Sequence, residues 1–317
     1  MNKPKFGVFL PFYALQTRNP TKYYAQLKAL VLECERLGYD SVWLDDHLMY
    51  GDIPILECWT TLSAFAAQTN RIRLGTLVTC NVHRNPTLLA KAAATLDVLS
   101  GGRLEFGFGA GCQQREHEAY GFGFPDIGVR VEMMAEALEV MLRLWTQQSS
   151  DFKGKYYSVD DATCEPKPLQ KPHPPITIGG SGEKHTLKVT AQYADRVDFG
   201  FLPTIDEYRH KLEILERHCT AAERDFSEIE RACWPSGQII VRSSQSEVEQ
   251  LASQMKNEGT PLQEYRQGTL AATPQECVSH LRRYIDLGAT YFLLYFGDLP
   301  QTRSLTLFAE EVAGELR

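Results

Sequence analysis

Residues that could carry acid–base chemistry surround His47. Asp45, Asp46 and His47 directly follow the apolar run at residues 41–44. An imidazole beside a carboxylate can hold a proton near neutral pH and donate it to a substrate. We therefore consider His47 a candidate catalytic proton donor. A structural role is the alternative for this histidine, because adjacent residues on a strand point to opposite faces and Asp46 need not contact it.

Two glycine-rich segments have the composition of ligand-binding turns. Gly179, Gly180, Ser181 and Gly182 follow an apolar run and precede a predicted helix that starts at Glu183. Free amides and the positive end of a helix dipole can bind a phosphate group at such a place, although a plain loop is the alternative. The Gly-x-Gly-x-Gly run at 107–111 is a weaker signal, because glycine also permits any tight turn.

Metal and serine chemistry are less favoured by the sequence. A metal-dependent hydrolase needs clustered ligands, and His47, His83 and His117 do fall on different predicted loops. However, no His-x-His motif follows the first strand, and none of the eight cysteines forms a Cys-x-x-Cys pair. The chain also lacks the Gly-x-Ser-x-Gly motif of a serine nucleophile. We therefore expect no metal site.

The elements that must position these residues alternate between apolar runs and segments of helical spacing. Predicted strands cover residues 6–10, 41–44, 72–79, 104–107, 176–178, 197–201, part of 233–241, and 291–296. Predicted helices cover residues 21–37, 57–69, 86–99, 129–145, 183–193, 205–222, 274–287 and 302–316. This alternation indicates an α/β protein with a parallel sheet, and the length favours a closed (β/α)8 TIM barrel. An open doubly wound sheet is less favoured, because Pro11-Phe12-Tyr13 stands where a dinucleotide-binding fold has its glycine motif.

A barrel of this kind brings the residues that follow each strand to one rim, so the polar and glycine-rich segments are expected to converge. Residues 147–175 are aromatic, proline-rich and polar, and we interpret them as an insertion between strands four and five. We expect residues 1–317 to form a single domain. Tyr13, Tyr50, His83 and the insertion are expected to build the substrate side of the rim.

Composition limits the partners of the protein. The chain has 317 residues, of which 43% are hydrophobic and 23% charged, and its net charge is -7 without a long basic run. This balance is typical of a globular protein and argues against a nucleic-acid surface. No apolar run reaches the roughly 18 residues of a membrane helix, and the first apolar run, 6–11, is too short for a signal peptide. We expect a cytoplasmic protein with reduced cysteines and a small-molecule substrate.

Several segments, taken together and in order, resemble the luciferase-like monooxygenase family. They are Trp43-Leu-Asp-Asp-His47, Glu57-Cys-Trp-Thr-Thr61, Gly75-Thr-Leu-Val-Thr79, Ala90-Lys-Ala-Ala-Ala-Thr-Leu-Asp97, Ser100-Gly-Gly-Arg-Leu104, Gly107-Phe-Gly-Ala-Gly111, Arg115-Glu-His-Glu-Ala-Tyr-Gly121, Phe152-Lys-Gly-Lys-Tyr-Tyr157 and Pro174-Pro-Ile-Thr-Ile-Gly-Gly-Ser-Gly-Glu-Lys184. The last segment, followed by Tyr193-Ala-Asp195, is similar to the branch that uses the deazaflavin coenzyme F420. The similarity is good from residue 6 to about residue 235 and looser beyond.

The resemblance implies a (β/α)8 barrel with an insertion, no tightly closed metal site, and F420 or FMN as the redox partner. Family members hold the ring of the cofactor against a bulge at the end of strand three, which commonly contains a non-prolyl cis peptide. The corresponding residues are Leu77, Val78 and Thr79. Family members bind the phosphate of the cofactor on glycine turns that match residues 179–182. They often form homodimers through helices.

The resemblance also assigns Asp46 and His47 to the neighbourhood of the reacting ring. Gly111 and Cys112 are expected to bind the cofactor as well. Some deazaflavin dehydrogenases carry a catalytic glutamate after the strand-four glycines, where this chain has Cys112. That departure argues against chemistry of the glucose-6-phosphate dehydrogenase type.

The function implied by these observations is hydride transfer between F420 and a small organic substrate, with His47 as the proton donor. The cofactor carries the hydride chemistry while the protein binds and orients the reactants. FMN-dependent oxygenation is the alternative within the family. A non-catalytic flavin-binding protein is the alternative outside enzymes.

Overall fold

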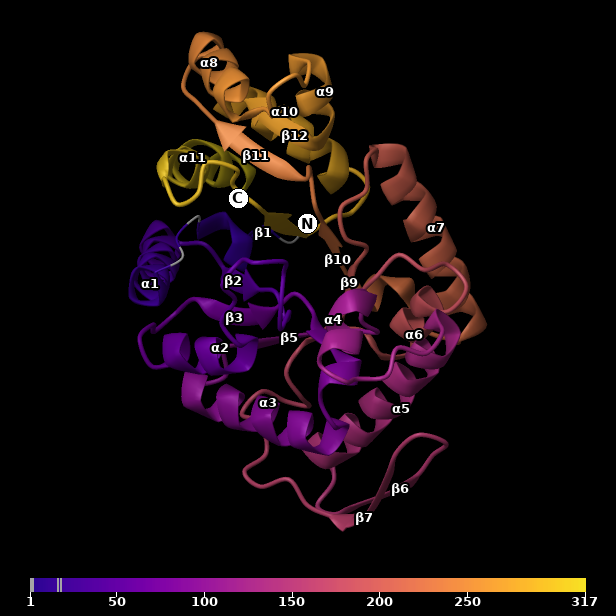
Figure 1. The fold of residues 1–317 in the computed structure, drawn as a ribbon. Coiled ribbons are helices and arrows are strands. Elements are labelled where there is room, and N and C mark those ends of the chain that lie inside the picture. The colour runs from indigo at the N-terminus through magenta and orange to yellow at the C-terminus, as the bar shows by residue number, and fades with distance from the viewer. Residues whose placement is uncertain (1–2, 16, 18) are drawn as a thin grey trace.

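The computed structural model of the chain describes residues 3–15, 17 and 19–317, and its central feature is a ring of parallel strands (Figure 1). Within those residues, eight strands close on themselves, because β1 pairs with both β2 and β13 while β3 pairs with β5. In ring order the strands are β1 (Lys5–Phe9), β2 (Ser41–Leu44), β3 (Arg73–Thr76), β5 (Leu104–Gly109), β8 (Ile176–Gly179), β9 (Arg196–Asp198), β10 (Glu230–Cys233) and β13 (Tyr291–Leu294). The (β/α)8 barrel predicted from the sequence is confirmed.

Helices surround the ring. The main ones are α1 (Pro20–Leu37), α2 (Cys58–Ala66), α3 (Pro86–Ser100), α5 (Ile127–Thr146), α6 (Thr186–Tyr193), α7 (Ile205–Ala221) and α10 (Pro274–Ile285). The chain ends in α11 (Arg303–Leu307), a π-helical segment (Phe308–Ala313) and α12 (Gly314–Leu316). Shorter helices are α4 (Gln114–Ala119) and the 3-10 turns Phe12–Leu15, Asn81–His83 and Phe226–Glu228. No helix in the described part of the chain is long and apolar enough to cross a membrane.

Local sequence signals explain where these helices begin and end, as α3 illustrates. The Asn85 side chain accepts a hydrogen bond from the Thr87 amide at 2.9 Å and caps the first turn. Pro86 occupies the first helical position, where a missing N–H costs nothing. Gly101 ends the helix with a φ of 70°, a left-handed conformation that glycine adopts readily.

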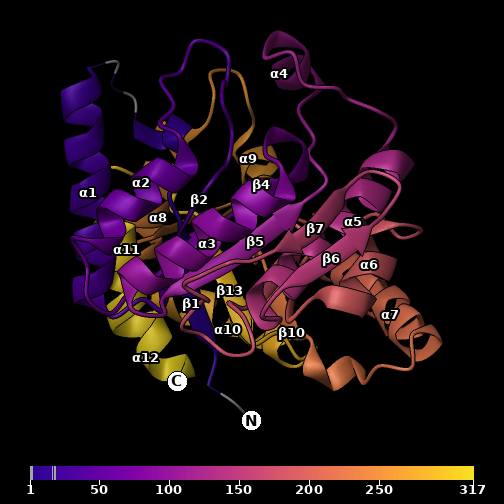
Figure 2. The same ribbon diagram turned by 90° about the horizontal axis from the view of Figure 1, so that it is seen from below.

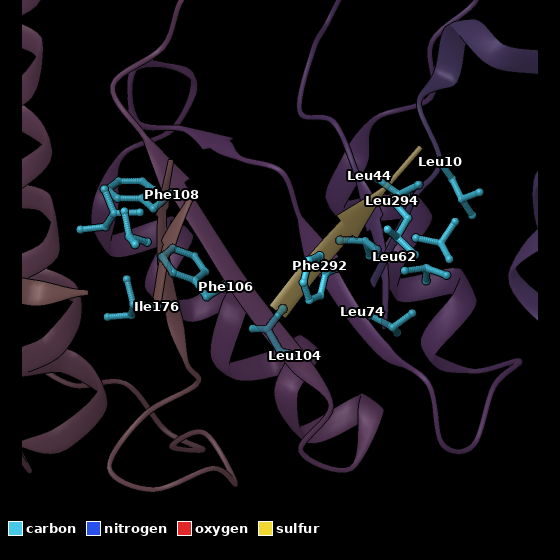
Figure 3. Close-up of a cluster of buried hydrophobic side chains, with 14 of the residues drawn as sticks. Leu10, Leu44, Leu62, Leu74, Leu104, Phe106, Phe108, Ile176, Phe292 and Leu294 are labelled. Atoms are coloured by element: carbon cyan, nitrogen blue, oxygen red, sulfur yellow. The ribbon is translucent and has the colours of Figure 1, made fainter. Parts of the chain in front are cut away.

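The main hydrophobic core lies between the strands and the surrounding helices. Side chains alternate along each strand, so Phe106 and Phe108 of β5 join this core together with Ile176 of β8 (Figure 3). Burying a side chain of this size contributes about 1.5–3 kcal/mol. A smaller apolar cluster that includes Trp43 and Leu293 occupies the alternate positions, which face the inside of the barrel.

The segment between α5 and β8 confirms the predicted insertion at residues 147–175. It contains an antiparallel hairpin of β6 (Ser150–Lys153) and β7 (Ser158–Ala162), which lies outside the ring near α5 (Figure 1). The hairpin does not pair with any barrel strand in the part of the chain that the structure describes.

The seventh barrel strand differs from the prediction. The sequence predicted one strand within 233–241, but β10 ends at Cys233, and β11 (Gln238–Val241) pairs with β12 (Thr269–Ala272) in a separate two-stranded sheet. Pro235 and Gly237 interrupt the run, since proline lacks the amide that a ladder requires. The prediction also omitted β12, α8 (Gln245–Met255) and α9 (Leu262–Gly268). These elements gather with α10 on one side of the barrel (Figure 1).

The strands run in one direction, so their carboxyl ends share one edge of the molecule. Figure 2 shows α4, which follows β5, at the upper edge, and α12 with the C-terminus at the lower edge. Loops that follow the strands therefore gather around the upper opening, which is the rim predicted to carry the chemistry.

Candidate active site

A cavity of about 480 Å³ opens at the carboxyl-terminal rim of the barrel. Ten of the residues singled out from the sequence line it: Asp46, His47, Leu77, Val78, Gly111, Cys112, Gly179, Gly180, Ser181 and Gly182. The predicted convergence of loops that follow β2, β3, β5 and β8 is therefore confirmed. The volume lies in the range of small-molecule and cofactor pockets.

A bulge after β3 forms one wall of this cavity. β3 ends at Thr76, the chain continues through a cis peptide bond between Leu77 and Val78, and β4 (Thr79–Cys80) then pairs with β5. The prediction of a non-prolyl cis bond within residues 77–79 is confirmed. Thr79 itself lies outside the cavity lining: it is buried, and its hydroxyl donates to the Thr76 hydroxyl at 2.9 Å. Its role is to hold the bulge, which corrects its assignment to the cofactor.

Glycines on the neighbouring strands make room for the bulge. A Cβ atom on Gly109 would lie 2.7 Å from a methyl carbon of Val78, and one on Gly179 would lie 2.9 Å from both methyl carbons. A Cβ atom on Gly107 would lie 1.8 Å from the carbonyl oxygen of Thr76. The first two glycines of the Gly-x-Gly-x-Gly run thus allow the chain to pack closely against the bulge. This packing explains why glycine occupies these positions, in addition to ligand binding and the needs of a tight turn.

His47 is held by Glu116, which arrives on α4. The two side chains meet at 3.1 Å between Nδ1 and Oε2, and the other carboxylate oxygen accepts hydrogen bonds from the amides of Leu48 and Met49. The hydrogen bond that His47 donates to Glu116 raises the pKa of His47 above its ordinary value and outweighs the opposing effect of burial. With Nδ1 engaged, Nε2 is the nitrogen that can exchange a proton with the cavity.

Asp46 has a different partner from the neighbouring histidine. Arg84 contacts both of its oxygens, at 2.6 and 2.8 Å, and the Cys80 amide donates to it at 3.0 Å. Burial alone would raise the pKa of Asp46, but the nearby His83, the Arg84 guanidinium and the Cys80 amide lower it. Arg84 also contacts Glu57 at 2.6 Å, so Asp46 connects the end of β2 to the loops around it. Asp46 does not orient His47, as the opposite directions of adjacent strand residues suggested.

The glycine turn after β8 forms the opposite wall. Gly180 has a φ of 134°, and its amide donates to the carbonyl oxygen of Asp198 at 2.8 Å. The amides of Ser181 and Gly182 make no hydrogen bond to the described part of the chain. A Cβ atom on Gly182 would lie 2.8 Å from the Thr186 hydroxyl, so glycine keeps this surface open. The following helix begins at Thr186 and not at Glu183, because residues 183–185 form a turn.

Some further residues that line the cavity were predicted at the rim, and others were not. His83, which was predicted for the substrate side of the rim, lines the cavity together with Glu116 and His117, whereas Asp198 and Trp234 were missed. The Trp234 indole donates to Asp198 at 2.9 Å, and burial raises the pKa of Asp198 to about 6. The sequence did not indicate Asp198, because the strand predicted over residues 197–201 contains it, whereas the observed β9 ends at Asp198.

The substrate side of the rim also differs from the prediction. Tyr13 and Tyr50 stack with their ring centroids 5.5 Å apart, and Tyr50 lies 6.2 Å from the His47 ring. Neither tyrosine lines the cavity, and no residue of the 147–175 insertion does so. The insertion packs outside the barrel, and its Tyr157 hydroxyl accepts a hydrogen bond from the Asn81 side chain at 3.4 Å without entering the cavity.

The barrel, the bulge after its third strand and the glycine turn on the same rim define the class of this protein. A family model described as luciferase-like monooxygenase matches residues 4–267. The chain belongs to this family, as its sequence segments predicted.

Comparison with individual proteins adds a redox cofactor to the family assignment. An F420-dependent glucose-6-phosphate dehydrogenase of Amycolatopsis mediterranei is 28% identical over 321 residues, with 90% of this chain and 92% of that protein covered. The structure of an F420-dependent secondary alcohol dehydrogenase in complex with an F420-acetone adduct has a TM-score of 0.80 and 24% identity, covering 100% of both chains. A riboflavin lyase with modified FMN has a TM-score of 0.83 and 15% identity, covering 100% of this chain and 92% of that one. Because both solved structures are less than 25% identical to this chain, their similarity shows only a shared fold.

Proposed function

We propose that this protein is an oxidoreductase that transfers hydride between F420 and a small organic substrate. The observation that carries the proposal is the pairing of the Leu77–Val78 bulge with the Gly179–Gly182 turn across one cavity. The similarity over nearly the full chain to F420-dependent glucose-6-phosphate dehydrogenases supports the choice of cofactor. His47 at the same cavity supplies a proton donor.

The residues present fit this cofactor. The free amides of Ser181 and Gly182 would bind its phosphate, and side chains in place of Gly180 or Gly182 would collide with Thr186. Leu77 and Val78 would back its ring, because both line the cavity and Val78 is locked between glycines of β5 and β8. The apolar character of this wall would exclude water from the ring.

Bound F420 supplies a carbon that accepts or donates hydride. The protein's own part is to orient the substrate and to manage a proton. His47 holds that proton at Nε2, and its raised pKa keeps the imidazolium form available toward neutral pH. Glu116 fixes the ring orientation through Nδ1, while the Asp46–Arg84 pair anchors the strand end that carries His47.

The charges around the cavity favour an uncharged substrate. Among the described residues no lysine or arginine lines it, whereas the acidic residues Asp46, Glu116 and Asp198 do. The free amides of the glycine turn suffice for the phosphate of the cofactor, and the described lining offers no lysine or arginine for a second anion. Cys112 also stands where, by the family resemblance, some deazaflavin dehydrogenases carry a catalytic glutamate. We therefore favour an alcohol or carbonyl compound over a sugar phosphate.

The test compares cofactors and then substrates on the purified protein. We expect F420 to bind more tightly than FMN in fluorescence titrations, and reduced F420 to be oxidised on addition of small ketones or aldehydes. Glucose 6-phosphate with oxidised F420 is the matched comparison, and we expect it to react more slowly than simple alcohols. Preferred binding of FMN, with rapid oxidation of the bound reduced form by air, would contradict the proposal in favour of a monooxygenase. Tight binding without any turnover would favour a flavin-binding protein.

A further inference from the structure

Three side chains beside the cavity have the composition of a metal site. Cys80, His83 and His117 place their ligand atoms within 4.8 Å of one another. The Cys80 sulfur lies 3.4 Å from Nε2 of His117, and the His83 and His117 ring centroids are 4.9 Å apart. We propose that these three residues bind a zinc ion. The proposal is independent of the redox function argued above.

His117 is arranged as a metal-binding histidine. Its Nδ1 lies 2.8 Å from the carbonyl oxygen of Gln113, which requires the proton on Nδ1 and leaves the lone pair on Nε2. A backbone carbonyl in this position is the usual partner that orients a histidine ligand. That lone pair faces the Cys80 sulfur at 3.4 Å, where it accepts from the thiol as long as no metal replaces the proton.

His83 makes no hydrogen bond with its ring nitrogens in the described chain. Its side chain is only 2% exposed. A buried polar group without a partner is costly, so such groups in native proteins usually have one. The nearest oxygens belong to Asp46 at 3.8 Å and Glu116 at 3.9 Å, beyond hydrogen-bond length. These two carboxylates favour a cation at this place.

The ligand set suits zinc. Thiolate and imidazole are its preferred ligands, and bond lengths of about 2.3 and 2.0 Å in a tetrahedron separate ligand atoms by roughly 3.3–3.6 Å. The 3.4 Å between Cys80 and His117 matches this spacing. The separations within the cluster reach at most 4.8 Å, and a shift of up to roughly 1.2–1.5 Å at His83 would bring them to this spacing. All three residues line the cavity, so the fourth coordination position would face it.

The fold, and not a motif, brings these ligands together. Cys80 and His83 lie in the segment after the bulge, while His117 comes from α4 after β5. A Cβ atom on Gly111 would lie 2.8 Å from the Cys80 sulfur and 3.2 Å from Nε2 of His117, so glycine opens the space between them. The expectation of no metal site rested on the missing Cys-x-x-Cys and His-x-His motifs and on the family resemblance. Neither motif describes a site of one cysteine and two histidines that come from separate loops.

The experiment measures metal binding without any cofactor or substrate. The full chain is stripped with a chelator and titrated with Zn²⁺ alone, and with Co²⁺ as a spectroscopic probe. We expect one zinc per chain and a cobalt spectrum with a thiolate charge-transfer band. Cys80→Ser and His83→Phe should each weaken zinc binding at least about a hundredfold, since even outer-shell changes cost about ten- to a hundredfold. Cys112→Ser is the matched control, because its thiol lines the same cavity outside the cluster and zinc affinity should not change.

The ring centroids of His83 and Phe122 lie 5.4 Å apart, and His83→Phe keeps an aromatic ring at this place. We therefore expect this variant to fold, which circular dichroism can check. Failure of the wild-type chain to retain stoichiometric zinc would overturn the proposal, and His83 would then be a protonated structural cation between Asp46 and Glu116. A cobalt spectrum without the thiolate band, or zinc affinity unchanged in Cys80→Ser, would overturn it equally. The cobalt spectrum of the wild-type chain tests whether Cys80 binds the metal even if a variant does not fold.

Discussion

The two ends of the barrel carry hollows of similar size but opposite character. The hollow at the amino-terminal ends of the strands is the larger, about 600 Å³ against 480 Å³ at the rim. Its charges are satisfied by one another: Glu105 accepts from both Arg73 and Arg196, and Arg196 also contacts Glu230 at 2.6 Å. At the rim, by contrast, the His83 nitrogens and the amides of the glycine turn are free. Free binding groups, rather than volume, distinguish the functional end.

The electrostatics of the two ends support the same distinction. Burial would raise the pKa of Glu105, but the two arginines lower it, so this carboxylate stays ionised in the barrel interior. Asp198 is buried near the rim without a cation in contact, and burial raises its pKa to about 6. Perturbed groups of this second kind are those that functional sites collect.

The largest effect that we expect from this difference between the two ends is a loss of turnover at the rim. We expect His47→Ala to lower turnover by about a hundred- to ten-thousandfold, the range typical of a lost general acid. Cofactor affinity should change little, because the phosphate and ring contacts come from other residues. Steady-state turnover and a cofactor titration on the same preparation measure the two quantities.

His173 offers a matched control, since it lies in the insertion away from the cavity. His173→Ala should leave turnover near the wild-type value. Survival of turnover in His47→Ala with a collapse of cofactor affinity would make His47 a binding residue. If neither quantity changes, the assignment of the site is wrong.

The opposite end should respond in stability instead of activity. Arg196→Met leaves Glu105 and Glu230 without their shared cation, with Glu105 buried in the barrel. Removing one member of a buried pair typically costs about 3–5 kcal/mol, which we expect as a loss in the free energy of unfolding measured with urea. Turnover per folded molecule should stay close to that of the wild type.

The exposed pair Arg303–Glu247 is the control for this change. Arg303→Met removes a similar contact at 2.6 Å from the surface, where solvent screens the charges, and we expect no measurable loss of stability. Equal losses in the two variants would mean that the Arg196 network does not stabilise the barrel specifically.

Two glycines near the rim are expected to differ in their effect on cofactor affinity. Gly180→Val adds a side chain toward Thr186, whose Cγ2 would lie 3.0 Å from the new Cβ, and should weaken cofactor binding by about tenfold or more, or about 1.4 kcal/mol. Gly121→Val is the control, because Gly121 also has a positive φ but nothing lies within 4 Å of its Cβ position. Both variants pay a backbone strain, so only the loss of cofactor affinity should separate them. Similar affinities in a cofactor titration would show that the turn is only a loop.

The sequence predicted the barrel well because its strands are compact apolar runs and its helices carry strong end signals such as Asn85, Pro86 and Gly101. It failed around the seventh strand, where Pro235 and Gly237 split one apolar region into strands of two different sheets. Ser244 followed by Glu247 was an overlooked signal for α8, since the Ser244 side chain accepts from the Glu247 amide at 3.4 Å.

The site was predictable only to the level of which loops meet. That His47 and the glycine turn share a rim follows from the order of strands and helices. The partner of His47 does not, because Glu116 is 69 residues away and the nearer carboxylate, Asp46, binds Arg84 instead. Side-chain pairing over such separations depends on the packing of α4 against the rim, which no local pattern specifies. The assigned roles of the lining residues stay predictions until the variants above are measured.

The smallest expected effect concerns Glu116, which acts on the chemistry through His47. Glu116→Gln keeps the size of the side chain and an oxygen that can meet Nδ1, but it removes the negative charge that raises the pKa of His47. A proton donor is active below its pKa and loses activity as pH rises through that value. With the pKa of His47 lowered, turnover should therefore fall at a lower pH than in the wild type. At the acidic end of the profile, where His47 is protonated in both proteins, turnover should differ by less than about tenfold, since the donor itself remains.

A pH profile of kcat separates this positioning role from a merely structural one. A structural defect lowers turnover at every pH by the same factor and leaves the position of the basic limb unchanged. Glu116→Asp, which restores the charge on a shorter side chain, should return the limb toward higher pH even where its overall turnover is lower. If the basic limb lies at the same pH in Glu116→Gln and the wild type, the ionisation seen in turnover does not belong to His47. The proton would then have to come from another group of the rim, and Asp198 is the first candidate to test.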